Sequence, residues 1–392
     1  MHFAIPDDAL PSDHRARLLW TVLGTLDLSA FSSDAKSVQG HAGRPLASVR
    51  MLLTLWLYAI SIGIGSAREI ERRTRTDEAF RWIVGDQSVS HARLSQVRIG
   101  YGKALDELFS DVLGVLLHKG LVSLDLVAQD GTRVRASASA PSFRREQSLE
   151  QCREQAALHV RGVLAEADDP ETTAGEKAAR LAAARDYQRR VDEALVTVRQ
   201  LREQGKDEPR ASTTDAEARV MKMADGGYRP GYNVQMATAG SPLGGSRTVV
   251  GVRVTNVGSD MGSVAPMLDD IERRTGMLPK VLLADANHAA HDCIRACAER
   301  SVQALIAVPA RSRKPGPNAD PAVQAWRDRM QTEQAKQTYR ARAGLCELSN
   351  AHLKTHHGVT QLLVRGLDKV RCVALLAGLA ANLVQHAASL LG

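Results

Sequence analysis

The fold is decided by residues 121–137, which read LVSLDLVAQDGTRVRAS. The first part of this stretch is apolar and rich in Val and Leu, and its alternation predicts a β-strand. Asp130 lies inside the strand pattern, where a buried carboxylate is costly unless a metal ion or a cationic group pairs with it. An edge-strand aspartate with its side chain in water is the simpler alternative. This stretch alone does not separate the two.

More strand patterns follow a highly charged middle region of the chain. The expected strands are residues 232–239, 248–255, 280–285 and 303–308. Helical patterns at 261–274 and 289–300 separate the later strands, and residues 322–391 are mostly helical. This order predicts an α/β core that is interrupted after its first strand.

The charged middle region spans residues 144–204 and is rich in Ala, Glu, Arg and Gln. Its composition predicts two charged helices that form a hairpin or an extended helical insertion. Such a pair is usually a solvated structural element. Contact with DNA or with a second subunit is the functional alternative.

Several short helices with basic faces are expected in residues 48–118. Ser48, Ser66 and Ser90 each precede a helical pattern and are expected to cap it. The arrangement is compatible with a helix-turn-helix-like module that places a recognition helix in the major groove of DNA. A purely structural or dimerising bundle is the alternative, because any small helical bundle has basic faces.

Composition narrows the class of protein. The 392 residues carry a formal net charge of +7, which favours a polyanionic partner. Five cysteines without a C-x-x-C pair argue against a zinc cluster and a disulfide framework. The N-terminus lacks a signal-peptide pattern, and the apolar runs 51–65 and 373–384 are shorter than the roughly 20 residues of a membrane span. We therefore expect a soluble, cytoplasmic protein without membrane contact.

Two further acids accompany Asp130 as candidate ligands. Asp285 ends the strand pattern 280–285, and Glu347 lies on an expected helix, residues 339–356. Phosphodiester cleavage commonly uses two divalent ions that clamp the attacking and leaving oxygens, and Mg²⁺ prefers oxygen ligands. Three carboxylates that meet at the sheet edge would serve that chemistry. A glutamate on a helix is otherwise normally solvated.

Several motifs resemble those of bacterial insertion-sequence transposases. They are AQDGTRVRASAS around Asp130, STTDAEARVMK at 212–222, GYRPGYNVQ at 227–235, LLADANH around Asp285, YRARAGLCELSNAHLK at 339–354 and GRPLASVRMLLTLWLYAISIG at 43–63. More narrowly, the chain resembles the DDE transposases that carry a Tyr–Arg–Glu–Lys signature and a helical N-terminal domain. The resemblance covers nearly the whole chain, with the motifs in matching order.

The resemblance implies a fold and a domain division. It implies an α/β RNase H-like catalytic core, a mixed sheet flanked by helices, in residues 119–392. A helical insertion would occupy about residues 142–210 of this core. An all-α DNA-binding domain would precede it in residues 1–118.

The resemblance also implies the residues of the site. Asp130, Asp285 and Glu347 would be the catalytic triad and would hold two Mg²⁺ ions, for which Mn²⁺ can substitute. The signature falls on Tyr339, Arg342, Glu347 and Lys354, of which the first, second and fourth would contact DNA phosphates. Asn287 and His288 lie where relatives often have Gly and an aromatic residue.

Other acids compete with this triad. Asp125 is expected on the same strand as Asp130, five positions away and therefore on its opposite face. Asp225 and Asp260 lie in polar, Gly-rich or cap-like contexts. Asp215 is the best reserve as a substrate or metal contact, because its motif is among those that resemble the family.

The implied function is transposition. Such a protein binds the terminal inverted repeats of its insertion sequence, nicks the double-stranded DNA by water attack and transfers the 3′-hydroxyl to target DNA. It would act as a homo-oligomer, a dimer in the active complex, and associate with the nucleoid in the cytoplasm. A catalytically inactive DNA-binding repressor and an RNase H-like nuclease without strand transfer are the alternatives.

Overall fold

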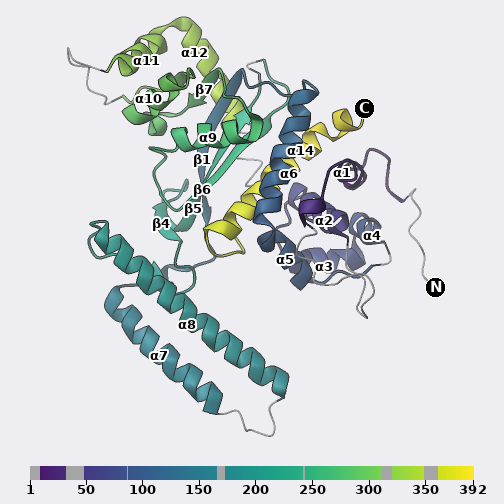
Figure 1. The fold of residues 1–392 in the computed structure, drawn as a ribbon, viewed down its shortest axis with the longest axis vertical. Helices are drawn as coiled ribbons and strands as arrows, with labels where there is room; N and C mark the ends of the chain where they lie inside the picture. Colours follow the sequence, from purple (N-terminus) through teal and green to yellow (C-terminus); the bar gives the residue numbers. More distant parts are fainter. Residues whose placement is uncertain are drawn as a thin grey trace.

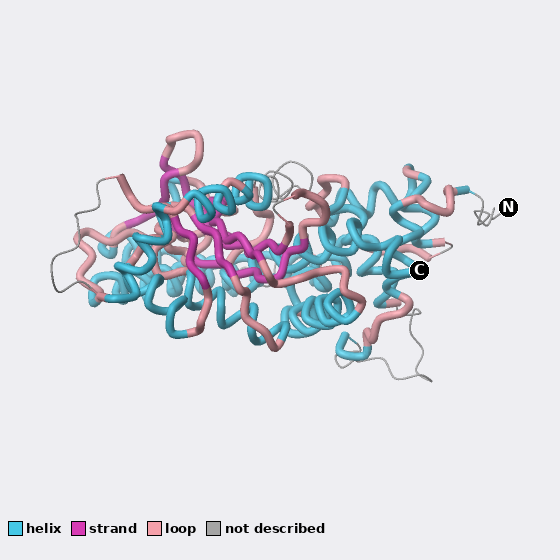
Figure 2. The backbone as a smooth tube through the Cα atoms, turned by 90° about the horizontal axis from the view of Figure 1, so that it is seen from above, coloured by secondary structure: helices cyan, strands magenta, loops and turns pink. Residues whose placement is uncertain are grey.

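In the computed structural model the described residues are 9–31, 48–85, 87–165, 173–241, 243–310, 320–347 and 361–392, and every structural statement below concerns them. A mixed six-stranded sheet lies in the middle of the molecule, with helices on both sides (Figure 2). In chain order the strands are β1 (Leu126–Arg135), β4 (Arg219–Lys222), β5 (Tyr228–Ala239), β6 (Thr248–Thr255), β7 (Val281–Ala284) and β8 (Gln303–Ile306).

Antiparallel and parallel strands meet at β1 in the centre of the sheet. The spatial order is β4-β5-β1-β7-β8, and β6 also pairs with β5. β1 runs antiparallel to β5 and parallel to β7, which in turn is parallel to β8. This mixed half-barrel sheet with flanking helices is consistent with an RNase H-like core, and the interruption after the first strand is confirmed.

The first strand is shorter than the sequence predicts. β1 begins at Leu126, so the expectation that Asp125 lies on the strand, facing away from Asp130, is wrong. Ser123 Oγ accepts a hydrogen bond from the Asp125 backbone N–H at 3.0 Å, which holds this residue in the turn before the strand. Its carboxylate forms an exposed ion pair with Lys280 at 2.6 Å.

Alternate residues of the central strands face two different apolar layers. Val127 and Leu282 belong to the main core, together with α9 (Val264–Thr275) and α14 (Leu367–Leu391). Their neighbours on the opposite face form a smaller cluster with the segment that follows the sheet. That cluster contains Leu126, Ala128, Leu283, Leu305, Ala335, Leu345 and Cys346. The remaining core helices are α10 (His291–Glu299), α11 (Pro321–Gln331) and α12 (Glu333–Tyr339), with the 3₁₀ turn η5 (Ala286–His288).

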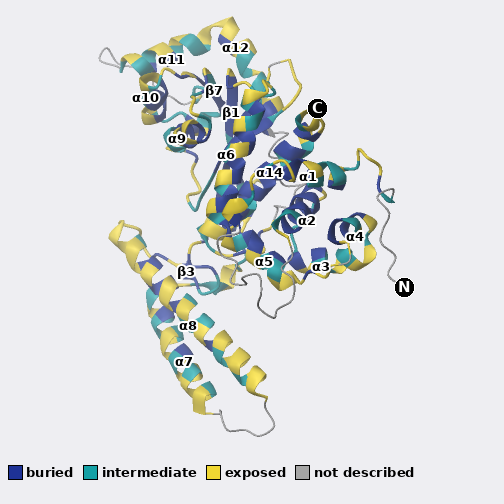
Figure 3. Cartoon of the chain, turned by 45° about the vertical axis from the view of Figure 1, so that its right-hand side comes forward, coloured by how far each residue is buried: buried dark blue, intermediate teal, exposed yellow. Residues whose placement is uncertain are grey.

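Helices also make up the described residues before β1. They are α1 (Arg15–Leu23), η2 (Ser29–Phe31), α2 (Val49–Ser61), α3 (Ala67–Thr76), α4 (Glu78–Val84), α5 (His91–Gly100) and α6 (Gly102–His118). The three expected N-caps are confirmed, because Ser48, Ser66 and Ser90 accept hydrogen bonds from first-turn backbone N–H groups of α2, α3 and α5. α2 is almost entirely buried (Figure 3).

α14 packs between these helices and the sheet (Figure 1). It has 25 residues, and an 18-residue stretch of it has a mean hydropathy of 1.5, so it is long and apolar enough to cross a membrane, but 61% of that stretch is buried inside the protein. It is therefore a core helix, and it is longer than the apolar run 373–384. Its Asn382 donates to Val249 O and accepts from Val249 N, both at 2.8 Å, and so completes the free edge of β6.

The charged middle region forms the expected hairpin. α7 (Glu146–Ala165) and α8 (Ala174–Glu203) project from the core, and their outer surfaces are largely exposed (Figures 1 and 3). Arg199 of α8 pairs with Glu146 and Glu150 of α7 at 3.1 and 2.6 Å. At the base, η3 (Ala140–Ser142) leads into the short antiparallel pair of β2 (Phe143–Arg144) and β3 (Ala211–Ser212).

Candidate active site

The parallel register of β1 and β7 brings Asp130 beside Asp285. Ala128 pairs with Leu283, and two residues further along each chain lie the two aspartates. Because side chains alternate along a strand, both carboxylates point to the face of the smaller apolar cluster. Burial raises the pKa of Asp130, and the negative charge of Asp285 raises it further. Asp130 and Asp285, which are distant in sequence, therefore lie beside each other on one face of the sheet.

Asp285 is held by three hydrogen bonds. Its Oδ1 accepts from the Asn287 backbone N–H at 2.9 Å and from His288 Nδ1 at 2.8 Å, and its Oδ2 accepts from Asn287 Nδ2 at 3.0 Å. Burial alone would raise the pKa of Asp285, but the His288 contact and the other donors hold it below its usual value. The side chain stays 28% exposed, so a ligand can still reach it.

Arg342 and Tyr339 lie at the same site. Burial favours a lower pKa for Arg342, yet nearby negative groups, Asp130 and Asp285 among them, hold it above the usual value. The guanidinium carbon lies 6.0 Å from the centre of the Tyr339 ring. Burial raises the pKa of Tyr339, and Asp285 contributes in the same direction. One cation and one phenol of the expected signature therefore lie close enough to the carboxylate pair to interact with it electrostatically.

Glu347 ends a π-helical segment, η6 (Ala343–Glu347), and its side chain lies outside what the structure describes. The expectation of an α-helix over 339–356 is wrong for residues 343–347, because α12 ends at Tyr339 and these residues form a π-helix, while residues 348–356 lie outside the described part of the chain. Buried Leu345 and Cys346 hold this segment against the face of the sheet that carries Asp130. Lys354 falls outside the described residues.

The chemistry of the carboxylate pair fits a divalent ion. No cluster of three or more His, Cys, Asp or Glu side chains with metal-binding geometry occurs within the described ranges. Mg²⁺, however, commonly takes only one or two protein carboxylates and completes its shell with water and substrate phosphate. Burial and the neighbouring Asp285 charge raise the pKa of Asp130, and a cation between the two carboxylates would stabilise their charged forms.

A buried polar network occupies the opposite face of the sheet. Asp260, only 2% exposed, accepts from Asn233 Nδ2 at 2.8 Å, Gln235 Nε2 at 2.6 Å and an Arg133 guanidinium nitrogen at 2.8 Å. Asp260 was expected only in a polar or cap-like context, and the role of Gln235 was not predicted from the sequence. The available signal was the pair of polar residues at alternate positions in the apolar strand 228–239, since such residues share one face.

Asp215 has a different environment from the carboxylate pair. It is 3% exposed, and the Tyr232 hydroxyl donates to its two carboxylate oxygens at 2.8 and 2.9 Å. Tyr232 pairs with Val134, four residues along β1 from Asp130, or about 13 Å at the usual rise of a strand. The structure therefore does not bring Asp215 to the Asp130 site. Asp225 is likewise separate, in an exposed ion pair with Arg229 at 2.8 Å.

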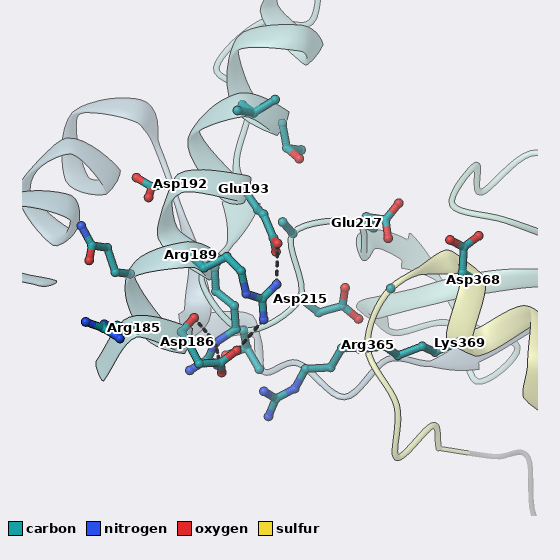
Figure 4. Close-up of a pocket in the computed structure, with 17 residues that line it drawn as sticks. Arg185, Asp186, Arg189, Asp192, Glu193, Asp215, Glu217, Arg365, Asp368 and Lys369 are labelled. Carbon is teal, nitrogen blue, oxygen red and sulfur yellow. Dashed lines mark hydrogen bonds and ion pairs between the residues drawn. The ribbon is translucent and has the colours of Figure 1, made fainter. Parts of the chain in front are cut away.

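Asp215 lines a cavity of about 870 Å³ between α8, the loop before β4 and the start of α14 (Figure 4). Basic and acidic side chains alternate around it, and Arg189 is already paired with Asp186 and Glu193. This mixed charge gives no preference for an anionic or a cationic ligand. The cavity is the junction between the hairpin and the core.

Two family models match the chain. The model described as "Transposase DDE domain" matches residues 291–387, and the one described as "Transposase domain (DUF772)" matches residues 5–99. No curated protein and no solved structure matches. The first match contains Tyr339, Arg342 and Glu347, whereas Asp130 and Asp285 precede it. The chain is similar to transposases at both ends, and the two matches together support an insertion-sequence DDE transposase.

Proposed function

We propose that the protein binds the terminal inverted repeats of its insertion sequence and catalyses metal-dependent cleavage and strand transfer of double-stranded DNA. The observation that carries this proposal is the placement of Asp130 and Asp285 side by side, with Arg342 close enough to interact electrostatically with both. Two acids and a cation in this arrangement suit a phosphodiester that approaches a divalent ion. We also place the chain in the Tyr–Arg–Glu–Lys branch of the family, on the positions of Tyr339, Arg342, Glu347 and Lys354.

In this proposal Asp130, Asp285 and Glu347 hold two Mg²⁺ ions, with Mn²⁺ able to substitute. The bound ions would activate the attacking oxygen and stabilise the charge on the leaving oxygen. Arg342 holds the scissile phosphate through its guanidinium, Tyr339 orients the backbone, and Lys354 adds a second cation. These roles use the residues that the signature supplies.

Two displacements at phosphorus would occur in sequence. In the first, a water oxygen attacks the phosphodiester at the element end, the bond to the 3′ oxygen breaks, and that oxygen leaves as a hydroxyl. In the second, this 3′-hydroxyl attacks a phosphodiester of target DNA, forms the new bond and displaces the target's 3′ oxygen. Each step breaks one P–O bond for each one formed, so no external energy source is needed.

DNA recognition is assigned to residues 1–118 and catalysis to residues 119–392, with the insertion at about 142–210. Exposed Arg68, Arg72 and Arg75 on α3, next to α5, support a phosphate-binding role for the first part. Arg72 is paired with Glu69 at 2.6 Å, so phosphate would have to compete with this carboxylate. Transposition joins two ends, so we propose a dimer at the nucleoid in the cytoplasm.

The test is an assay of DNA cleavage and joining. The full-length protein is incubated with labelled duplex that carries the inverted repeat, in Mg²⁺, Mn²⁺, Ca²⁺ or EDTA. Cleaved and joined products are expected in the first two conditions, and Asp130→Asn, Asp285→Asn and Glu347→Gln should abolish both products. Asp225→Asn, which removes an exposed acid elsewhere, is the matched control.

The other outcomes identify the alternatives. Binding of the repeat with no cleavage in any metal would indicate a repressor. Hydrolysis without joined products would indicate a nuclease. Cleavage in EDTA, or full activity of Asp130→Asn, would contradict the assignment of the carboxylates.

A further inference from the structure

We propose that His288 and Gln235 are positioning residues that orient the Asp285 carboxylate for metal binding, through the buried polar network on the opposite face of the sheet. The inference rests on the proposed function, because it assigns a role to residues behind the same site.

His288 connects the two faces of the sheet. It has no exposed surface, and it follows Asp285 by one 3₁₀ turn. Its Nδ1 lies 2.8 Å from Asp285 Oδ1, and its Nε2 lies 3.4 Å from Gln235 Oε1. A carboxylate accepts hydrogen bonds and cannot donate them, so Nδ1 carries the proton of the first contact. Rotation of the Asp285 carboxylate away from His288 would break this hydrogen bond.

The amide of Gln235 is held in one orientation by its own partners. Its Nε2 donates to Asp260 Oδ1 at 2.6 Å, and this leaves Oε1 to face His288. Gln129 Nε2 donates to the same Oε1 at 3.2 Å. Arg133 donates to the other oxygen of Asp260 at 2.8 Å. Donors and acceptors therefore follow a fixed order from Arg133 through Asp260 to Gln235 Oε1, and this acceptor makes a hydrogen bond with His288 when Nε2 carries a proton as well as Nδ1.

Gly131 brings the same network against the residue after Asp130. A Cβ at Gly131 would clash with Gln235 Nε2 and Asp260 Oδ1, so only glycine leaves room for the network here. On its other side, the Gly131 backbone N–H donates to Asp130 Oδ1 at 2.9 Å. The network therefore supports both carboxylates, one through the β1 backbone and the other through the His288 ring.

Loss of an outer partner of a metal ligand typically weakens metal affinity by about 10–100-fold. A network that only filled space would affect stability and leave metal affinity unchanged. Metal binding measured directly therefore separates a positioning role from a structural one, without reference to DNA cleavage.

The experiment measures Mn²⁺ binding by titration calorimetry and electron paramagnetic resonance, on the full-length protein with and without inverted-repeat duplex. His288→Phe should weaken binding about 10–100-fold. His288→Asn places an amide nitrogen near the position of Nδ1 and should restore much of the affinity. Gln235→Met should weaken binding while the Asp285 contact to His288 remains possible. Thermal unfolding of each variant is recorded alongside.

His386→Phe is the matched control, because His386 is also buried and bonded to Thr248 at 2.7 Å, away from the carboxylates. It should bind Mn²⁺ as the wild type does. If His288→Phe does not fold, the Mn²⁺ affinities of His288→Asn and Gln235→Met are each compared with that of the wild type. A Gln235→Met variant that binds Mn²⁺ as tightly as the wild type overturns the inference.

Two failures are distinguishable. Tight Mn²⁺ binding by the wild type, with unchanged affinity in folded His288→Phe, contradicts the positioning role and leaves the proposed function intact. A wild type that neither binds Mn²⁺ nor cleaves DNA contradicts the proposed function, and the positioning role with it.

Discussion

Asp130, inside β1, lies level with Asp285, the first residue after β7, on two neighbouring parallel strands. The residues in register before them, Ala128 and Leu283, are fully buried. The carboxylates thus lie where the apolar face of the sheet ends and the accessible site begins.

Asp285→Asn should reduce DNA cleavage by at least about 100-fold while binding of the inverted repeat is retained. The expected size is that of losing one electrostatic stabiliser of the transition state. Cleavage rates under single-turnover conditions, with band-shift measurements of binding, check this. A variant that cleaves within about threefold of wild type would remove Asp285 from the ligands.

Arg342→Ala should weaken DNA binding and lower the salt slope of the binding constant by about 0.9, as expected for one lost phosphate contact. Arg342→Lys should keep most of the slope and still lose cleavage, because lysine lacks the planar fork that holds two phosphate oxygens. Affinities at several salt concentrations measure both effects. Lys336→Ala, which removes an exposed cation of α12 that pairs with Glu333, is the control and should leave cleavage unchanged.

Asn382→Leu should lower the free energy of unfolding by about 2–4 kcal/mol, because it leaves the buried N–H and C=O of Val249 without a partner. Urea denaturation measures the loss. Ser389→Ala, an exposed position of the same helix, should change stability by less than about 0.5 kcal/mol. Similar losses in both variants would mean that the backbone groups of Val249 find another partner.

Asp270 should contribute a pH-dependent part of the stability. Burial alone would raise its pKa, but Arg274 at 2.9 Å, together with Arg273 and the Val252 backbone N–H, holds the pKa below the usual value of 3.8. Its folded pKa is therefore below its unfolded one, so the stabilisation is present above pH 3.8 and is lost as pH falls through the folded pKa.

Asp270→Asn should accordingly destabilise the protein by about 3 kcal/mol at pH 7, because it breaks a buried ion pair. The difference from wild type should narrow at pH 3. Urea denaturation at the two pH values checks this, with exposed Asp225→Asn as the control. If the stability difference between wild type and Asp270→Asn were the same at pH 3 as at pH 7, the lowered pKa of Asp270 would be contradicted.

Local patterns of the sequence were sufficient for several parts of this fold. Asp130 and Asp285 each end or interrupt an apolar strand pattern, and this contrast is visible without the structure. The serine caps and the charged hairpin likewise depend on neighbours within a few turns of helix. In each case the residues that determine the structure lie close together in the sequence.

The features that the sequence did not predict depend on contacts between residues that are distant in the chain. Gln235 reaches the back of Gly131 only because β5 pairs with β1 in one particular register, across the whole insertion. The π-helical segment that ends at Glu347 depends on how Leu345 and Cys346 fit onto the sheet. Neither register nor packing of this kind is encoded in the periodicity of a single segment.

The α7–α8 hairpin, which lies between β1 and β5 in the sequence, has a consequence for how the chain folds. These two strands are neighbours in the sheet, yet residues 136–227 separate them, and closing so long a loop would slow their pairing. α7 and α8 can form from local contacts. The pairing of β2, before α7, with β3, after α8, then brings the two ends of this segment together. A preformed hairpin would make β1 and β5 kinetically close, so mutations that loosen the α7–α8 pair should slow folding more than they speed unfolding.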